Sequence, residues 1–221
     1  MNNFDLYKML NFAVNKDIYA KAISPPEFQL ELQAGNMRHF RKRLGLPETY
    51  IPGQANEGAG VNRLTDTDLL PFLVEGIKPC VNGLVMLNPS PYYVADYYTS
   101  TSITSETIGI DEVGNRRNNY ITKPTAQYLA AYIVLGGLKI LPENTTGNVN
   151  VSYYRKPADP TFVTSTDPVT LELIYSNTSV ELEWDDGSKL DILSVILQKF
   201  GLNLSRQDVM QLGAKLIERG K

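Results

Sequence analysis

The stretch Val149-Asn150-Val151-Ser152-Tyr153-Tyr154 has the clearest strand pattern in the chain. Its odd-numbered residues are Val, Val and Tyr, and they alternate with Asn, Ser and a second Tyr. Successive side chains of a strand point to opposite faces, so the odd-numbered set lies on one face and the even-numbered set on the other. The alternation therefore predicts a half-buried strand.

The sequence before this strand predicts a series of short strands. Tyr128–Leu135 and Leu138–Leu141 flank Gly136-Gly137, a dipeptide typical of a two-residue hairpin turn. Pro and Gly recur between residues 71 and 91, which excludes long helices there. Residues 156–168 contain several chain breakers and are expected to be irregular. Three further segments contain β-forming residues: Leu84–Leu87, Tyr92–Tyr98 and Ile103–Ile110.

Both ends of the chain predict helices. Apolar residues recur at three- and four-residue spacing from Leu6 to Ile18, and a second helix follows Ser24 and ends at Gly45. Near the other end, Asp185-Asp186 precedes an apolar helix that ends at Gly201, and Ser205 begins another. Each end therefore predicts a helical hairpin.

The order of these elements predicts an α+β fold. We expect the helical hairpins of residues 1–50 and 181–221 to pack together as one helical domain. Residues 51–180 then form a central β-rich region of antiparallel strands that projects from the helices.

Composition excludes several classes of function. The 221 residues include one Cys and one His, so an intrachain disulfide and a Cys/His zinc site within one chain are excluded. We expect no metal and no cofactor. The net charge of -3 argues against a protein that coats nucleic acid. The N-terminus lacks the features of a signal peptide, and no apolar run reaches the roughly 18 residues of a membrane span, so we expect no membrane association.

The basic segment Arg38–Arg43 contains the single histidine, His39. As a general base, His39 would need an orienting carboxylate and a nucleophile, and the sequence identifies neither. Cations in the last turn of a helix are also typical of favourable interaction with the helix dipole. A third interpretation is contact with DNA phosphates or with an acidic partner. Arg116 and Arg117 in the loop 114–120 could also contact a polyanion, and the alternative is solvated loop charge. The candidate contact residues are Arg38, Arg41, Lys42, Arg43, Arg116 and Arg117.

The carboxylate motifs of the chain give only weak evidence for a catalytic site. Asp66 and Asp68 lack the Gly and distal Glu of an EF-hand loop, and Gly58-Ala59-Gly60 fails as a phosphate loop. Glu183 and Asp186 could supply the paired acids of a glycosidase, but capping of the next helix explains Asp185 and Asp186 as well. We therefore expect no enzyme.

Tyrosine is the dominant aromatic residue, with 13 copies, and three adjacent pairs lie on predicted strands. One Tyr of each pair can serve the core while the other contacts a partner. The alternative is an ordinary sheet with a Tyr-rich exposed face. The candidate subunit-interface residues are Tyr93, Tyr98, Tyr154 and Arg155.

Two groups of segments carry a family resemblance. One is Glu181-Leu182-Glu183-Trp184-Asp185-Asp186 with the helix that ends at Phe200-Gly201, and the other comprises Ile121–Thr125, Gly137–Pro142 and Val149–Pro157. Over residues 110–221 the chain resembles virion structural proteins of the crAss-like tailed phages of gut Bacteroidetes. Within that group it is similar to neck proteins that form rings between the portal and the tail.

The resemblance implies a non-enzymatic head-to-tail connector. Such proteins form homo-oligomeric rings, commonly twelve-fold, that line the DNA channel with non-specific contacts and dock the portal and further neck or tail proteins. The chain would then reside in the virion, and in the host cytoplasm during assembly. Residues 54–62 and 156–168 would be candidates for ordering at a subunit interface. The competing interpretations are a tail or receptor-contact protein and a virion-associated glycosidase.

Overall fold

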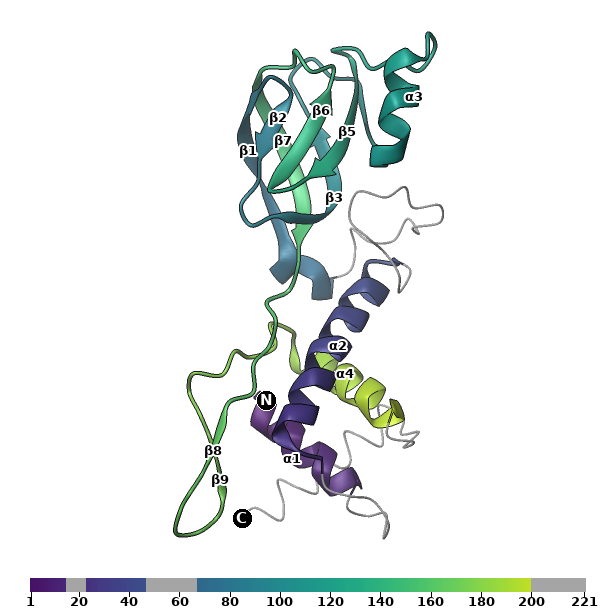
Figure 1. Cartoon of the computed structure of the whole chain (residues 1–221). Coiled ribbons are helices and arrows are strands. Elements are labelled where there is room, and N and C mark those ends of the chain that lie inside the picture. The colour runs from purple at the N-terminus through teal and green to yellow at the C-terminus, as the bar shows by residue number, and fades with distance from the viewer. Residues whose placement is uncertain (15–22, 47–66, 200–221) are drawn as a thin grey trace. The chain divides into compact units, whose positions relative to one another are not determined.

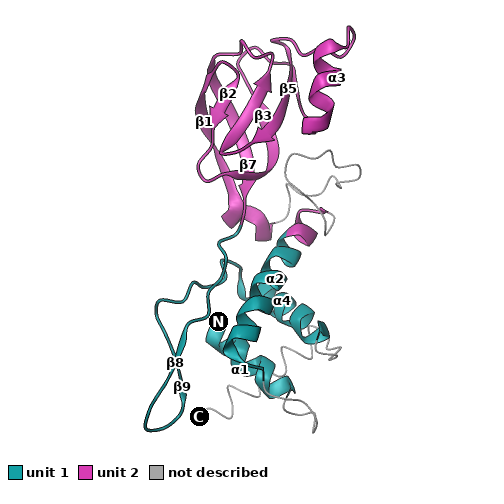
Figure 2. Ribbon diagram, viewed as in Figure 1, with its two compact units in different colours: residues 1–40, 157–221 teal, residues 41–156 magenta. Residues whose placement is uncertain are grey.

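The computed structural model describes residues 1–14, 23–46 and 67–199 (Figure 1). The loop 52–62 and the helix expected after Ser205 lie outside the described residues. The chain divides into two compact units, residues 1–40 with 157–221 and residues 41–156 (Figure 2). Residues 157–180 thus group with the helices, whereas the sequence analysis assigned them to the β-rich region.

Unit 2, residues 41–156, is built on a mixed sheet with the order β3-β7-β1-β2-β6-β5-β4. All neighbouring strands pair antiparallel except β4 and β5, which are parallel. The β-rich, mostly antiparallel centre is therefore confirmed. Its strands are β1 (Leu73–Val81), β2 (Leu84–Met86), β3 (Pro91–Tyr98), β4 (Thr104–Thr107), β5 (Tyr128–Val134), β6 (Gly137–Leu141) and β7 (Gly147–Arg155).

The strand predicted first, β7, lies between β3 and β1. Its partner β1 was not predicted as a strand, although Asn82-Gly83 after it is a hairpin signal. Both residues of that dipeptide have positive φ, +50° and +72°, as a type I′ turn requires. The hairpin predicted at Gly136-Gly137 turns one residue earlier, because Gly137 already belongs to β6. A Cβ on Gly137 would lie 2.2 Å from the Val85 carbonyl oxygen, so only glycine fits there.

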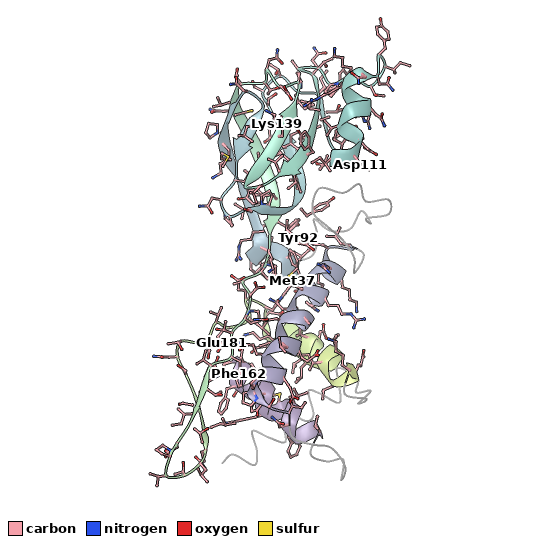
Figure 3. The ribbon with its side chains drawn as sticks, in the orientation of Figure 1. Met37, Tyr92, Asp111, Lys139, Phe162 and Glu181 are labelled. Atoms are coloured by element: carbon pink, nitrogen blue, oxygen red, sulfur yellow. The ribbon has the colours of Figure 1, made fainter. Side chains whose placement is uncertain are left out.

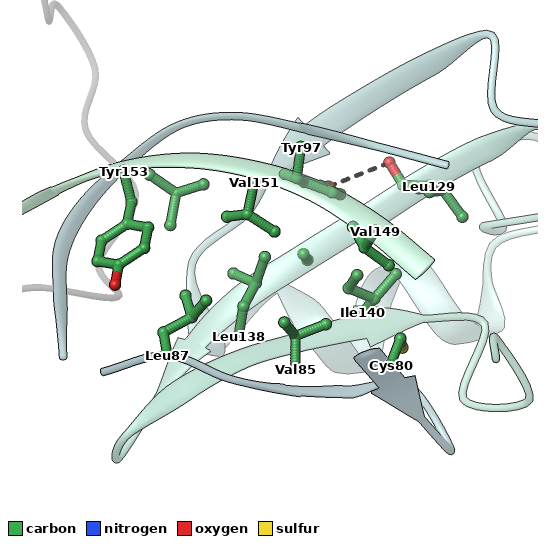
Figure 4. Packing of buried hydrophobic residues seen from close by; sticks show 12 residues of the cluster. Cys80, Val85, Leu87, Tyr97, Leu129, Leu138, Ile140, Val149, Val151 and Tyr153 are labelled. Carbon is green, nitrogen blue, oxygen red and sulfur yellow. Dashed lines mark hydrogen bonds between the residues drawn. The ribbon is translucent and has the colours of Figure 1, made fainter. Parts of the chain in front are cut away.

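The inward side chains of the sheet form one buried cluster (Figure 4). The odd-numbered residues of the first quoted stretch belong to it, as their alternation predicted. Full burial of each large apolar side chain contributes about 1.5–3 kcal/mol. The cluster consists of Cys80, Val85, Leu87, Val94, Tyr97, Leu129, Ala131, Leu138, Ile140, Val149, Val151 and Tyr153.

The sheet curls into a near-barrel. Its terminal strands, β3 and β4, are joined by side chains: the Tyr97 hydroxyl accepts from the Glu106 N–H at 3.1 Å and donates to the Glu106 carbonyl at 2.5 Å. Beyond β4 the predicted strand Ile103–Ile110 ends early. A short 3-10 turn, η3 (Ile110–Glu112), and α3 (Val113–Asn118) follow instead. Another 3-10 segment, η2 (Thr67–Phe72), precedes β1.

Unit 1, residues 1–40 with 157–221, contains α1 (Asn3–Val14), most of α2 (Pro25–Arg43) and α4 (Asp186–Lys199). Asn2 and Asp5 cap α1 reciprocally, with N–H to oxygen distances of 2.8 and 3.0 Å. At α2, Glu27 accepts from the Ser24 N–H. The helix predicted from Leu6 is present as α1, the one predicted after Ser24 is present as α2, and the first C-terminal helix is present as α4. Packing of two complete hairpins stays a prediction, because residues 15–22 and 200–221 lie outside the described residues.

Unit 1 also contains a small hairpin of β8 (Thr164–Thr166) and β9 (Leu173–Tyr175), which was not predicted. Aromatic stacking anchors its base to the helices: Phe162, labelled in Figure 3, lies 5.0 Å from Tyr7 and 4.9 Å from Phe28 between ring centroids. On the other strand, Tyr175 stacks on Phe4 at 5.5 Å. The irregular chain expected over 156–168 is confirmed for 156–163, whereas Thr164–Thr166 form the strand β8.

Candidate interaction surfaces

The basic residues at the end of α2 are only partly available for a partner. In unit 2, Arg41 Nε donates to the Tyr92 hydroxyl at 2.9 Å, and the Arg43 guanidinium pairs with Asp68 at 2.8 Å. Lys42 is exposed, and Arg38, on the part of α2 in unit 1, is exposed as well. Arg41 and Arg43 thus hold neighbouring structure in place.

Arg116 and Arg117 lie in the last turn of α3 and fix that helix to the sheet. Arg116 pairs with Glu106 on β4 at 2.6 Å, and Arg117 pairs with Glu143, which follows β6. Ion pairs of this exposed kind contribute about 0.2–1 kcal/mol each. The local positive charge is balanced, which reduces the attraction of this surface for DNA phosphates.

The three tyrosine pairs differ in which of their side chains are buried. Tyr97 is buried and Tyr98 is exposed, as the alternation predicts. Tyr93 is half-buried. The interface assignment of Tyr154 does not match its position, because it is only 2% exposed. Both faces of β7 are covered at this end of the strand, so the adjacent Tyr153 and Tyr154 are buried together.

Arg155, the fourth candidate interface residue, is half-buried and contacts η2. Its guanidinium donates to the Pro71 carbonyl at 3.1 Å and lies over the Phe72 ring, 5.5 Å from the centroid. A guanidinium on an aromatic face gains a cation–π attraction. Arg155 therefore stabilises the start of β1 within its own unit.

The carboxylates considered for glycoside hydrolysis have structural contacts in unit 1. Asp185 caps α4 by accepting from the Gly187 N–H at 3.1 Å and the Ser188 N–H at 3.0 Å. Asp186 pairs with the N-terminal ammonium at 3.2 Å. Glu183 accepts from the Ala158 N–H at 2.8 Å. The geometry of Asp185 is therefore that of a helix cap, the alternative given above for this residue.

His39 and Trp184 meet in the core of unit 1. The imidazole lies edge-on to the indole at 4.8 Å between centroids and is nearly buried. The indole N–H donates to Asn36 Oδ1 at 2.7 Å, and Asn36 in turn donates to the Ala158 carbonyl at 3.1 Å. The tryptophan of the acid-Trp-acid segment is thus buried, and its hydrogen bond to Asn36 links α2 to the turn before α4.

The hairpin β8–β9 presents apolar side chains that the sequence analysis missed. Val169 is 87% exposed and Leu171 is 76% exposed, and both lie in the connection between the two strands. Asp167 holds that connection by accepting from the Val169 and Thr170 N–H groups at 2.7 and 3.2 Å, which lowers the pKa of its carboxyl. Asp167-Pro168 is a turn signal that could have revealed the hairpin.

Leu171 has a φ of +57°, a left-handed conformation that leucine rarely adopts. Such a residue costs about 1–2 kcal/mol relative to a right-handed one. Leu171 closes the turn in this conformation, because its N–H donates to the Asp167 carbonyl at 2.9 Å, while its side chain stays exposed.

No known protein family matches the chain, and no curated protein matches it. Among residues 1–14, 23–46 and 67–199, no group of three His, Cys, Asp or Glu side chains is arranged to hold a metal ion. None of the helices in those ranges is long and apolar enough to cross a membrane.

Proposed function

We propose that the chain is a structural protein of a tailed-phage virion that forms a ring in the neck, between the portal and the tail. The ring lines the DNA channel and docks further neck or tail proteins. The resemblance of residues 110–221 to crAss-like neck proteins supports a location in the virion and a position in its neck. The observation that carries an assembly role is the anchored hairpin β8–β9, whose connection exposes Val169 and Leu171.

The hairpin is suited to a subunit contact for two physical reasons. An isolated two-stranded hairpin is marginally stable in water, but stacking of Phe162 and Tyr175 on the helices fixes the base of this one. Its apolar connection then gains about 25 cal/mol for each Å² of apolar surface that a neighbour covers. Because the base is already ordered, less conformational entropy is lost on association.

The charge distribution is compatible with a channel that DNA passes through. The pairs of Arg43 with Asp68 and of Arg116 with Glu106 reduce the number of cations available to phosphate. DNA binding that depends on fewer phosphate contacts is weaker, and its affinity changes less with salt concentration. Arg38 and Lys42 are the exposed members of the basic segment and are the residues we expect nearest to DNA or to a neighbouring ring.

The test combines virion location with a matched set of variants. Electron microscopy of virions that carry a label on this chain should place the label at the neck. The double change Val169→Lys and Leu171→Lys should abolish incorporation, whereas Leu30→Lys, which alters another exposed apolar residue, on α2, should leave incorporation unchanged.

A label at the tail tip would overturn the proposal and support a receptor-contact protein. Virions without the chain would also overturn it. Cleavage of a glycan by the purified protein, abolished by Glu183→Gln, would instead establish a glycosidase. Equal incorporation of the hairpin variant and the wild type would remove the assembly role of the hairpin.

A further inference from the structure

We propose that unit 2 associates head to tail with a second copy of this chain, and that the loop after α3 in one copy docks on the outer face of the β1–β2 hairpin in the next. This inference rests on the proposed ring function and deepens it by naming the two surfaces of one subunit contact. The loop is termed the knob (residues 119–123), and the receiving face is termed the patch (Ile77, Pro79, Val81 and Met86).

The knob places two large apolar side chains in solvent. Tyr120 is 99% exposed and Ile121 is 89% exposed, which is unusual for adjacent residues of this size. Tyr and Ile together provide an amphipathic ring and an apolar branch, a composition that favours burial at a protein contact.

The knob is held in a defined shape before any partner arrives. Asn119 Oδ1 accepts from the Ile121 N–H at 2.9 Å and from the Thr122 N–H at 3.3 Å. This is a side-chain turn that orders the backbone locally. The ion pairs of Arg116 and Arg117 fix α3, from which the knob extends. A preformed loop loses little entropy on docking, so its apolar contacts contribute more of their free energy to binding.

The patch lies on the outer face of β1 and β2. Residues Ile77, Pro79 and Val81 alternate with inward residues such as Cys80, and pairing of Val81 with Leu84 brings Met86 to the same face. Ile77, Val81 and Met86 are 64%, 63% and 64% exposed. An apolar sheet face of this kind, with no described segment over it, is a surface that a partner covers.

Charge supports a second copy as the occupant. Glu75 lies two residues before Ile77 on the same exposed face, and Lys123 lies two residues after Ile121 in the knob. Docking of the apolar pair on the patch can therefore bring an exposed ammonium to an exposed carboxylate. Complementary charges at the rim of an interface contribute specificity and orientation.

The position of the two surfaces is compatible with a ring. Within unit 2, β1 and β2 lie on the side of the sheet away from α3 (Figure 1). A contact between two different faces of the same chain is heterologous, so a growing assembly keeps one free knob at one end and one free patch at the other until a ring closes. A face-to-face dimer would use both surfaces at once and would not propagate.

Disulfide trapping tests the contact directly. In a chain with Cys80→Ser, where the hydroxyl can still donate to the Thr145 carbonyl, Ile121→Cys is combined with Met86→Cys and the purified protein is oxidised at high concentration. The expected result is a ladder of cross-linked multimers. The matched control combines Ile103→Cys, an exposed isoleucine outside the knob, with Met86→Cys and should give no ladder.

A charge swap tests the orientation. Lys123→Glu should lower the cross-linking yield about two- to fivefold, the effect of one exposed pair, and Glu75→Lys in the same chain should restore it. Circular dichroism checks that each variant is folded. Absence of a ladder with the knob–patch cysteines, or a ladder that the control produces equally, overturns the inference.

The two proposals fail separately. A photo-reactive residue at position 120 in virions should join two copies of this chain. Cross-linking to a different virion protein would overturn the self-contact while leaving the neck location intact. Absence of the chain from the neck would overturn the proposed function whatever the cross-links show.

Discussion

The hydroxyl of Tyr97 accepts a hydrogen bond from the backbone N–H of Glu106 and donates one to its carbonyl oxygen, so one side chain joins β3 to β4. These strands are the two ends of the sheet order, and each would otherwise present an open edge. Burial raises the pKa of the Tyr97 phenol far above its usual value, so the hydroxyl keeps its proton and remains a donor. The near-barrel is therefore closed by a tyrosine as well as by its apolar core.

Tyr97→Phe should lower the free energy of unfolding by about 1–3 kcal/mol, because it leaves two backbone groups of Glu106 without their partner. Tyr153→Phe is the matched control. Its hydroxyl is buried and has no hydrogen-bond partner among the described residues, so its removal should leave stability unchanged or raise it by about 1 kcal/mol. Urea unfolding followed by circular dichroism measures both. Equal losses for the two variants would show that Tyr97 does not close the sheet.

Asn36→Ala should destabilise unit 1 by about 1–3 kcal/mol, because the buried Trp184 indole N–H loses its acceptor. Trp184 is the single tryptophan of the chain, so its fluorescence reports this site without labelling. Gln33→Ala is the control, since it removes a less buried hydrogen bond to the Pro160 carbonyl and should cost less. A larger loss for Gln33→Ala than for Asn36→Ala would contradict the importance of the Asn36–Trp184 pair.

Leu171→Gly should order the β8–β9 connection more strongly, by about 1 kcal/mol, because glycine adopts a φ near +57° without the penalty that leucine bears. The same change removes an exposed apolar side chain, so we expect weaker incorporation into virions. Hydrogen exchange at the amides of Asp167 and Leu171, which close the turn, measures the first effect. Faster exchange in the glycine variant would mean that Leu171 stabilises its own turn through contacts.

The order of the β8–β9 connection should depend on pH through Asp167. The Val169 and Thr170 N–H groups hold the pKa of its carboxyl below 3.8. A pKa that is depressed in the folded state stabilises the turn above 3.8, and this contribution is lost as the pH falls through the lower, folded value. Carboxyl chemical shifts during an NMR titration should give a pKa below 3.8, and Asp167→Asn should abolish the pH dependence. A midpoint at or above 3.8 would contradict the hydrogen bonding.

Much of the fold follows from local sequence. The alternation in Val149–Tyr154 predicts β7 and the buried members of its cluster, and the terminal apolar spacing predicts α1, α2 and α4. The strand β1 escapes such a prediction because Ile77 and Val81 are exposed apolar residues while Gly76 and Pro79 resemble turn signals. Its pairing with β7 is a long-range contact, which overrides weak local propensity.

The candidate contacts were harder to predict, because exposure depends on what the folded chain covers. Tyr154 and Arg155 follow the alternating pattern of β7, but they lie where η2 and neighbouring side chains cover both faces of that strand. Tyr120 and Ile121 give the opposite case: nothing in their local sequence shows that an Asn119 turn holds them in solvent. The dipeptides Asp167-Pro168 and Asn82-Gly83 are turn signals in the sequence, and they mark the two hairpins β8–β9 and β1–β2 that were not predicted.

Electron cryomicroscopy of the virion at side-chain resolution tests the neck-ring proposal most directly. The predicted result is a ring of this chain between portal and tail, in which Tyr120 and Ile121 of each copy contact Ile77, Val81 and Met86 of the next. A neck built without this chain, or density for it only at the tail tip, would contradict the proposal.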